Sequence, residues 1–281
     1  MKILVTGATG FVGKHVLNEL LKYDHQIIVT IRNKVSVTDL PDAIKVVELD
    51  LDNLESNKNY FTETGKPDLL IHLAWQGLPN YKEKFHVEKN LPSHSAFLKN
   101  MVENGLQNVV VTGTCFEYGM KEGCLSEDME SDPQNPYAMA KDELRKFLEE
   151  LQQQHPFTLK WIRLFYMYGE GQNPNSLLSQ LESALQKGDE VFNMSGGEQI
   201  RDYLSVEKVA EYIVKIALLN EITGIINCCS GNPIKVKTFV ENYLEEKNKK
   251  ITLNLGYYPY PDYEAMAFWG DDKKLKTIIT I

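Results

Sequence analysis

The sequence predicts an α/β protein with a Rossmann-type, doubly wound parallel sheet and a smaller C-terminal substrate lobe. Three observations support this prediction. Short apolar segments of β character alternate with helical segments through the first 165 residues, the pattern of repeated β-α-β units with buried strands. The first apolar segment leads directly into the glycine-rich stretch TGATGFVG. After residue 166 the alternation loosens, as expected for a second, smaller unit.

The predicted elements follow one another in a regular order. Strands are expected at Lys2–Thr6, Gln26–Ile31, Ile44–Leu49, Leu69–Leu73, Asn108–Thr112 and Thr158–Phe165. Helices are expected at Phe11–Lys22, Lys82–Asn104 and Tyr137–Gln154. Residues 1–165 therefore form the expected dinucleotide-binding domain.

Residues 166–281 form the expected substrate lobe, which is discontinuous because residues 190–228 partly return to the main domain. The stretch GEGQNPNS predicts a loop, and it precedes a helix at Leu177–Lys187. A further helix at Val206–Leu219 comes just before a strand at Gly224–Cys228.

Composition narrows the class of partner. The chain has 281 residues, 43% of them hydrophobic and 25% charged, with a net charge of -9. Such a chain has no general attraction for nucleic acid or for anionic membranes, which favours small-molecule partners. No apolar run reaches the roughly 18 residues of a membrane span, and the first residues have a strand pattern rather than that of a signal peptide. Four cysteines without a CxxC pair suggest neither a disulfide scaffold nor zinc, so we expect a cytoplasmic protein.

The glycines at the end of the first strand predict a dinucleotide site. In a strand-turn-helix context Gly7 permits the tight turn, Gly10 lets a pyrophosphate approach the backbone, and Gly13 lets the helix pack closely on the sheet. The free N–H groups of the helix that begins near Phe11 would hold the phosphates. The expected cofactor contacts here are Gly7, Thr9, Gly10, Phe11, Val12 and Gly13. The alternative is a tight turn with a structural role only.

The spacing TGxxGxxG resembles the short-chain dehydrogenase/reductase superfamily, and later motifs resemble its extended branch of nucleotide-sugar epimerases, dehydratases and reductases. Asp50-Leu51-Asp52 is similar to the adenine-contacting acidic motif, and His72-Leu73-Ala74-Trp75 to the HLAA segment beside the nicotinamide ribose, with Trp75 in place of alanine. Asn90 stands where the family has a structural asparagine. The resemblance implies cofactor contacts by Asp50, Leu51, Leu73, Ala74, Trp75 and Leu164.

The end of the second strand bears on the choice between NAD and NADP. A carboxylate there would bind the ribose 2'-OH of NAD and repel a 2'-phosphate. The strand instead ends in Ile31-Arg32-Asn33. Arg32 could bind the phosphate in a bidentate, charge-assisted contact, which favours NADP(H), with NAD(H) also possible. The alternative is a solvated arginine in a loop.

Tyr137 and Lys141 supply the family's YxxxK pair. Four residues apart on one helix, the two side chains share a face, so the ammonium can lie near both the cofactor ribose and the phenol. A nearby cation favours the phenolate, and we therefore expect a lowered pKa at Tyr137 and an acid/base role near neutral pH. Both residues are expected to contact the cofactor as well.

Thr114 is the expected third catalytic residue, by its position before a Tyr-Gly pair that resembles the family's VYG. Its hydroxyl would stabilise charge on the substrate oxygen; the alternative is a strand-end cap. The related 4,6-dehydratases have an Asp-Glu pair after this threonine, where this chain has Cys115 and Phe116, so dehydration is not expected. Cys115 is expected to be a small buried side chain beside the substrate, with an auxiliary acid as the alternative. Glu117, one position later, is not excluded from the pocket.

The substrate lobe offers two further candidates. Arg201, in a segment that resembles RDYxHV, is expected to hold the nucleotide diphosphate, with a structural ion pair as the alternative. Tyr166 stands where the family often has an asparagine that contacts the sugar nucleotide. None of the six histidines is paired at metal-ligand spacing, and hydride transfer needs no metal.

Together these residues predict an NADPH-dependent reductase of a nucleotide-activated keto sugar, a 4-keto-6-deoxyhexose, with Tyr137, Lys141 and Thr114 as catalytic residues. An NAD-dependent nucleotide-sugar 4-epimerase uses the same triad and stays open. A nucleotide-sensing binding protein without turnover is the alternative from another class. The resemblance also implies a homodimer joined through the helices at 82–104 and 137–154.

Overall fold

A computed structural model describes residues 1–33, 40–41 and 43–280 of the chain. Its centre is a seven-stranded sheet with the order β11-β7-β5-β4-β1-β2-β3, in which every neighbouring pair is parallel. The strands are β1 Lys2–Thr6, β2 Gln26–Ile31, β3 Lys45–Glu48, β4 Leu69–His72, β5 Asn108–Thr114, β7 Thr158–Leu164 and β11 Gly224–Cys228. The predicted Rossmann-type fold is confirmed.

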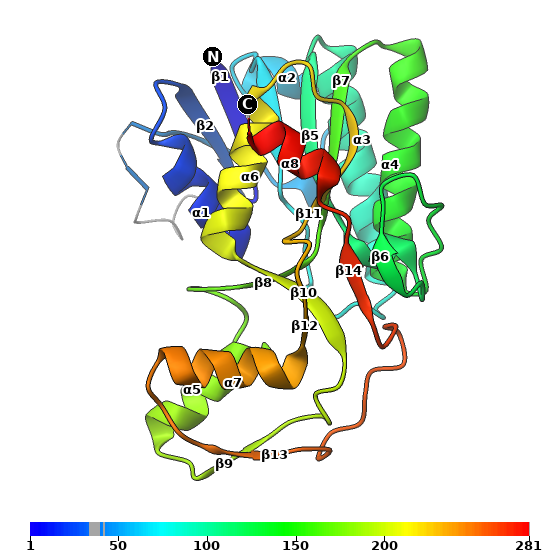
Figure 1. The fold of residues 1–281 in the computed structure, drawn as a ribbon. Helices are drawn as coiled ribbons and strands as arrows, with labels where there is room; N and C mark the ends of the chain where they lie inside the picture. The colour runs from blue at the N-terminus through cyan, green and yellow to red at the C-terminus, as the bar shows by residue number, and fades with distance from the viewer. Residues whose placement is uncertain (34–39, 42, 281) are drawn as a thin grey trace.

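Helices cover both faces of this sheet (Figure 1). One face carries α1 Phe11–Leu20, α6 Val206–Leu218 and α8 Lys273–Ile279, whose apolar residues share one core with the sheet. The other face carries α2 Tyr60–Glu63, α3 Leu91–Glu103 and α4 Pro136–Gln154, which enclose a second core. Strands buried on both faces read as continuous apolar runs such as Ile3-Leu4-Val5, which is why the sequence identifies them.

The order in which successive strands are added to the sheet reverses beside β1. Strands β1, β2 and β3 follow one another outward, and the chain then crosses to β4 on the other side of β1. In such sheets the carboxyl ends of the strands at the reversal form a crevice that binds ligands. The arrangement therefore places the candidate site between β1 and β4.

The second group of elements lies below the main sheet in Figure 1. It contains α5 Leu177–Lys187, α7 Val236–Glu246 and the pair β9 Val191–Asn193 with β13 Thr252–Asn254. A small core that includes Leu181, Met194 and Val240 holds it together. The sheet of β8 Tyr166–Tyr168, β10 Ile200–Ser205 and β12 Pro233–Lys235 and the pair β6 Gly123–Leu125 with β14 Phe268–Gly270 complete the architecture.

One predicted helix begins later than expected. The helix expected at Lys82–Asn104 is a π-helical turn at His86–Asn90, here η3, followed by α3. Residues 73–84 form a loop, in which Gly77 has φ of +80°. The chain thereby leaves β4 as a long irregular segment that runs along the crevice.

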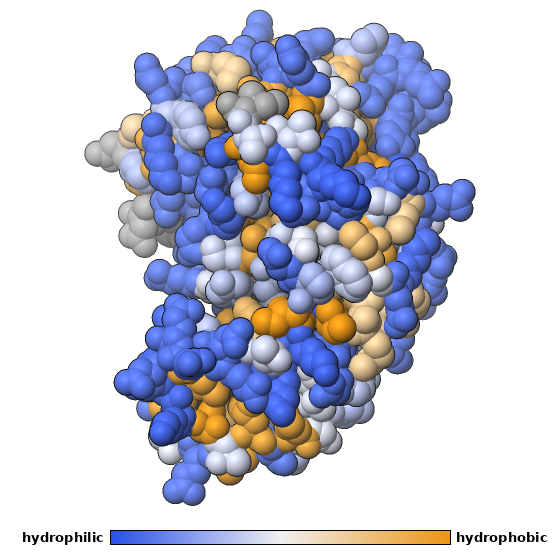
Figure 2. All heavy atoms as spheres, viewed as in Figure 1, coloured by the Kyte–Doolittle hydropathy of each residue, from blue (hydrophilic) through white to orange (hydrophobic). Residues whose placement is uncertain are grey.

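Hydrophilic side chains cover most of the face seen in Figure 2. Within the described part of the chain, no helix is long and apolar enough to cross a membrane. All four cysteines are free thiols, and Cys115, Cys228 and Cys229 are buried.

Candidate functional site

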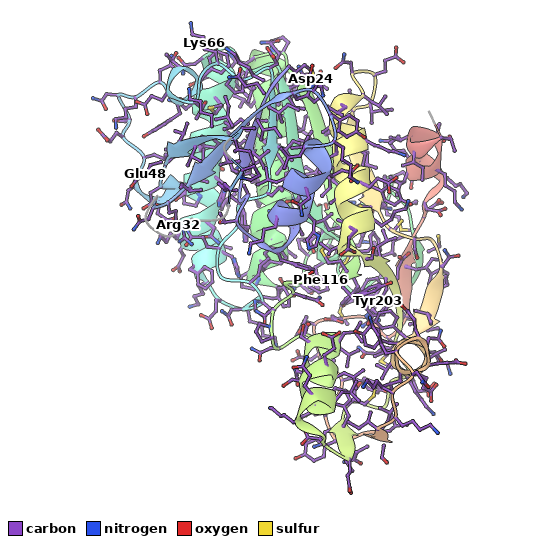
Figure 3. All side chains as sticks on the ribbon, turned by 90° about the vertical axis from the view of Figure 1, so that its left-hand side faces the viewer. Asp24, Arg32, Glu48, Lys66, Phe116 and Tyr203 are labelled. Atoms are coloured by element: carbon purple, nitrogen blue, oxygen red, sulfur yellow. The ribbon has the colours of Figure 1, made fainter. Side chains whose placement is uncertain are left out.

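A cavity of about 730 Å³ opens at the carboxyl ends of the central strands. Arg32, just after β2, and Phe116, in the turn after β5, line it, and Figure 3 shows both at the end of the sheet that faces the smaller lobe. The cavity therefore runs from the adenosine side expected near β2 to the catalytic residues expected after β5.

The glycine loop has the geometry of a phosphate cradle. Gly7 has φ of +70°, a conformation that favours glycine, and a Cβ on Gly13 would lie 2.1 Å from the Gly7 carbonyl oxygen. Helix α1 begins directly after Gly10 with no side-chain cap, so its first N–H groups face the cavity mouth without an internal acceptor. The residues present thus fit a dinucleotide pyrophosphate at this helix N-terminus.

Most residues predicted from the sequence meet in this one cavity. Its lining includes the following predicted residues: Gly7, Thr9, Gly10, Phe11, Val12, Gly13, Arg32, Leu51, Leu73, Ala74, Trp75, Thr114, Cys115, Tyr137, Lys141, Leu164 and Tyr166. Asp50 and Arg201 are the two predicted site residues that do not line it.

Asp50 has a local structural task. Its carboxylate accepts hydrogen bonds from the Asp52 N–H, at 3.1 Å, and from the Asn53 side chain, and so caps the short helix Leu51–Asn53. Asp52 instead reaches the cavity rim, where its carboxylate accepts a hydrogen bond from Gln76 and pairs with Lys89. The acidic motif thus faces the cavity through Leu51, with Asp50 turned to the backbone.

Arg32 lies at the cavity rim in a polar chain. Its guanidinium donates to Oε1 of Gln76 at 2.9 Å, and the Gln76 amide donates to Asp52 at 2.7 Å. The described end of β2 offers no acidic side chain to a ribose. The Arg32 guanidinium is therefore held where the adenosine ribose of a dinucleotide is expected.

Thr114, Tyr137 and Lys141 form the predicted catalytic group. Helix α4 begins at Pro136 with Asn135 as its N-cap, which places Tyr137 in the first turn against the end of β5. The Thr114 hydroxyl accepts a hydrogen bond from the Phe116 N–H at 3.3 Å, and it lies beside the Tyr137 phenol at the cavity wall. Lys141, one turn further along α4, donates from Nζ to the Thr112 carbonyl at 2.8 Å. All three side chains are buried at the cavity wall.

The expected lowering of the tyrosine pKa is wrong for this arrangement. Burial raises the pKa of Tyr137 above its usual value, and the nearby Tyr81 and Glu117 raise it further. Burial also lowers the pKa of Lys141 to about 7, which weakens it as a permanent cation. For the pKa of Tyr137, the loss of solvation on burial outweighs the lowering expected from a lysine four residues away on the same helix.

Glu117 is a structural residue. Its carboxylate accepts hydrogen bonds from the Thr114 N–H at 2.8 Å, from Trp161 at 3.1 Å and from Nε of Arg163 at 2.7 Å. With the Thr114 side chain it forms a capping box around the turn Cys115–Tyr118, here η4. Glu117 therefore fixes the backbone that carries the Thr114 hydroxyl, outside the cavity lining.

Cys115 fits the prediction of a small buried side chain. It is 5% exposed, lines the cavity, and has a thiol pKa raised by burial. Such a thiol stays neutral. Phe116 also lines the cavity and packs edge-on against Tyr81, so the position of the second dehydratase acid is aromatic.

Arg201 is held in an ion pair. It is 1% exposed, and its guanidinium donates to Glu264 at 2.8 Å and to the carbonyls of Ile200 and Met266. Tyr166 donates to the same Glu264 oxygen at 2.6 Å. The structure thus shows the alternative foreseen for Arg201, a structural ion pair, and its diphosphate role stays a prediction.

Several lining residues carried no recognisable sequence signal. Tyr81 enters from the loop after β4, accepts a hydrogen bond from the Tyr137 N–H at its carbonyl, and packs its ring 5.5 Å from that of Tyr137. His94 enters from α3, and Gln172 and Asn173 from the loop before α5. The apolar periodicity of α3 does mark the buried face that carries His94.

No group of three or more histidine, cysteine or acidic side chains that could hold a metal ion occurs among residues 1–33, 40–41 and 43–280. The site chemistry derived from these residues is that of hydroxyl, phenol and ammonium groups around a dinucleotide cradle.

Comparison with known proteins agrees with this geometry. The model of the NAD dependent epimerase/dehydratase family matches residues 3–229. The chain belongs to this family. It is therefore an NAD(P)-dependent oxidoreductase of the extended short-chain dehydrogenase/reductase type that modifies nucleotide sugars.

Two relatives in this family are dehydrogenases of deoxy sugars. The chain is 31% identical over 271 residues to the dTDP-6-deoxy-L-talose 4-dehydrogenase (NAD(+)) of Aggregatibacter actinomycetemcomitans, covering 96% of this chain and 99% of the relative. It is 28% identical to the GDP-6-deoxy-D-talose 4-dehydrogenase of the same organism, covering 99% and 91%.

Two solved structures share the fold. MoeE5 in complex with UDP-glucuronic acid and NAD has a TM-score of 0.83 at 23% identity, with 100% of this chain and 93% of that chain covered. The UDP-N-acetylglucosamine 4-epimerase from Methanobrevibacter ruminantium M1, in complex with UDP-N-acetylmuramic acid, has a TM-score of 0.85 at 19% identity, with 99% and 91% covered.

Proposed function

We propose that this enzyme interconverts the C4 ketone and the C4 alcohol of a nucleotide-linked 6-deoxyhexose, with reduction of the 4-keto sugar as its working direction. The observation that carries the proposal is that Thr114, Tyr137 and Lys141 line one wall of the same cavity, with Lys141 one helical turn from Tyr137. The relative that is 31% identical supports the sugar class, because its name describes C4 oxidation of a 6-deoxy sugar.

The catalytic group suits proton donation. When bound, the nicotinamide dinucleotide supplies hydride to the ketone or takes it from the alcohol. Tyr137 keeps its proton at neutral pH because burial raises its pKa, so the phenol is in the form that donates to a developing alkoxide. Thr114 donates a hydrogen bond to the same oxygen. The Lys141 ammonium lies on the same face of α4 as Tyr137, where its positive charge stabilises the phenolate that forms when the proton is given up.

The rest of the pocket disfavours dehydration. Eliminating water across C5 and C6 needs an additional acid and an additional base, and the chain has the neutral thiol of Cys115 and the ring of Phe116 at those positions. Glu117 is occupied by Arg163 and Trp161. We therefore assign Cys115 and Phe116 to packing beside a sugar that already has a methyl group on C5.

The cofactor preference has support on both sides. Arg32 at the rim favours the 2'-phosphate of NADP(H), whereas the relative 31% identical is an NAD(+) enzyme by name. We propose that the enzyme uses NAD(H), and the preference for NADP(H) predicted from Arg32 stays a prediction. The ratio of kcat/KM for NADPH to that for NADH distinguishes the two.

The test of the proposal is nicotinamide absorbance with nucleotide-linked 4-keto-6-deoxy sugars. We expect stoichiometric oxidation of NADH or NADPH, abolished by Tyr137→Phe, and the reverse reaction with the 4-hydroxy product. A sugar nucleotide that changes configuration at C4 without net cofactor oxidation would instead establish the 4-epimerase. Cofactor retained through purification would favour that alternative as well.

We also propose that two copies associate through α3 and α4. Val87 on η3, the turn that leads into α3, and Met139 on α4 are large apolar side chains that are 38% and 47% exposed, and α4 packs against both η3 and α3. Burial of such side chains against a second copy is favourable. Light scattering on a column should give twice the 32.1 kDa mass of one chain, and Met139→Lys should shift the protein toward that single mass.

A further inference from the structure

Lys141 has an unusual environment for a buried ammonium. Its side chain is 2% exposed, and the Thr112 carbonyl is its one hydrogen-bond acceptor among the described residues. The titratable groups that face it are Glu117 from η4, His72 from β4, His94 from α3 and His86 from η3. Burial lowers the pKa of all three histidines, so these rings are neutral and add no positive charge beside the ammonium. Glu117 is the one of these groups that favours the charged lysine, but its carboxylate is already paired with Arg163.

The Trp75 indole is a direct partner of the ammonium. Nζ of Lys141 lies 4.1 Å from the centre of the Trp75 ring, within the range of a cation–π interaction, for which indole is the best natural ring. The family segment that this stretch resembles has alanine at the same place, which offers no ring face.

Neighbouring rings fix the indole in this position. The Trp75 Nε1–H donates to Nδ1 of His86 at 3.0 Å, and the indole stacks on His94 at 4.7 Å with an interplanar angle of 24°. Nδ1 of His86 also accepts from Asn90, so its proton sits on Nε2, which donates to the Asn80 carbonyl at 3.1 Å. Nδ1 of His94 shares a hydrogen bond of 2.7 Å with His72.

We propose that Trp75 is a positioning residue for Lys141: its indole face holds the ammonium at the cavity wall between the Thr112 carbonyl and the catalytic tyrosine. The inference goes beyond the proposed function, although its kinetic part rests on the Tyr137 and Lys141 roles stated there. A leucine at position 75 keeps apolar bulk but offers no π face, whereas phenylalanine keeps a weaker one.

A direct measurement of the lysine state tests the proposal without any substrate. We would follow the 13Cε shift of Lys141 against pH by NMR in lysine-labelled protein, with Lys141→Arg to assign the signal. Burial lowers the pKa of Lys141 to about 7, and losing the ring face should lower it further. We expect the midpoint to fall by roughly 0.5 to 1.5 pH units in Trp75→Leu, and by less in Trp75→Phe.

Trp269→Phe is the matched control, because Trp269 lies on β14 outside the cavity lining and its loss should leave the midpoint unchanged. An unchanged or raised midpoint in Trp75→Leu would overturn the proposal. If the leucine variant does not fold, the graded shift between wild type and Trp75→Phe decides in the same way.

Kinetics add a second readout. We expect Trp75→Leu to lower kcat by about 3- to 30-fold, with Trp75→Phe restoring most of it, and the KM for the sugar nucleotide to change little. A loss confined to KM, or equal losses in the two variants, contradicts a role through Lys141. If wild-type enzyme turns over no 4-keto-6-deoxy sugar, the proposed function fails, while the NMR titration still tests Trp75.

Discussion

Replacing Glu117 by glutamine tests the buried pair beneath the catalytic threonine. The Glu117 and Arg163 side chains are 0% and 1% exposed, and Nε of Arg163 lies 2.7 Å from the carboxylate. Glutamine has nearly the same shape but no charge, so the guanidinium would stay buried without its counter-ion. Removing one partner of a buried ion pair costs about 3–5 kcal/mol of unfolding free energy.

Urea denaturation measures this cost. With a slope of about 3 kcal/mol/M, expected at the upper end for a chain of this size, the midpoint should fall by about 1–2 M. The matched control is Glu143→Gln, whose carboxylate is 59% exposed and pairs with Lys146 on the surface of α4. Exposed ion pairs contribute about 0–1 kcal/mol, so the denaturation midpoint of Glu143→Gln should stay close to that of wild type.

A second step separates the charge from the hydrogen bonds. In Glu117→Gln/Arg163→Met the uncompensated charge is gone, and we expect part of the lost stability to return. Three donors converge on the two oxygens of Glu117, and glutamine keeps only one acceptor oxygen, so we expect the turn below Thr114 to loosen and activity to stay low in both variants. The reasoning is refuted if Glu117→Gln lowers the unfolding free energy no more than the surface control does.

Three further predictions concern the cavity. Gly13→Ala places a Cβ 2.1 Å from the Gly7 carbonyl oxygen, and we expect cofactor affinity, measured by quenching of protein fluorescence, to fall at least about tenfold; unchanged affinity would contradict the cradle. Arg32→Ala should lower kcat/KM for NADPH relative to NADH, and an unchanged ratio would mean that this guanidinium reads no phosphate. The pKa of Lys141 falls from 10.5 to about 7 on folding, so the unfolded chain keeps a proton that the folded protein releases between these values, and wild-type stability should rise with pH across that window. Lys141→Met lacks this dependence, and its thermal midpoint should exceed that of wild type at pH 7 by a margin that shrinks by pH 9.

The main sheet and the cofactor half of the site could be predicted because their signals are local. A strand buried on both faces is an apolar run, and the glycine loop follows β1 within a few residues. Parallel strands bring their carboxyl ends to one edge, so residues that follow β4, β5 and β7 gather in one cavity even though the sequence separates them widely.

The substrate half could be predicted less well, because its partners are distant in the chain and short in extent. Glu264 pairs with Arg201 from 63 positions away, and nothing in the motif around Arg201 indicates that partner. Tyr81 lies in the irregular segment between β4 and η3, where no periodic pattern indicates which side chains face the cavity. The strands of the smaller lobe have three residues each in β8, β9, β12 and β13, too few to establish an alternating pattern.

The catalytic pair shows where spacing stops being informative. Four residues on a helix put Tyr137 and Lys141 on one face, and the structure keeps both at the cavity wall. Their charge states depend instead on what packs around them: burial raises the pKa of the phenol and lowers that of the ammonium, and the indole of Trp75, from the loop after β4, faces the lysine. Because that indole replaces an alanine, the acid/base strength of the pair is set by a residue outside the pair itself, and a change at Trp75 should retune the enzyme without touching either catalytic side chain.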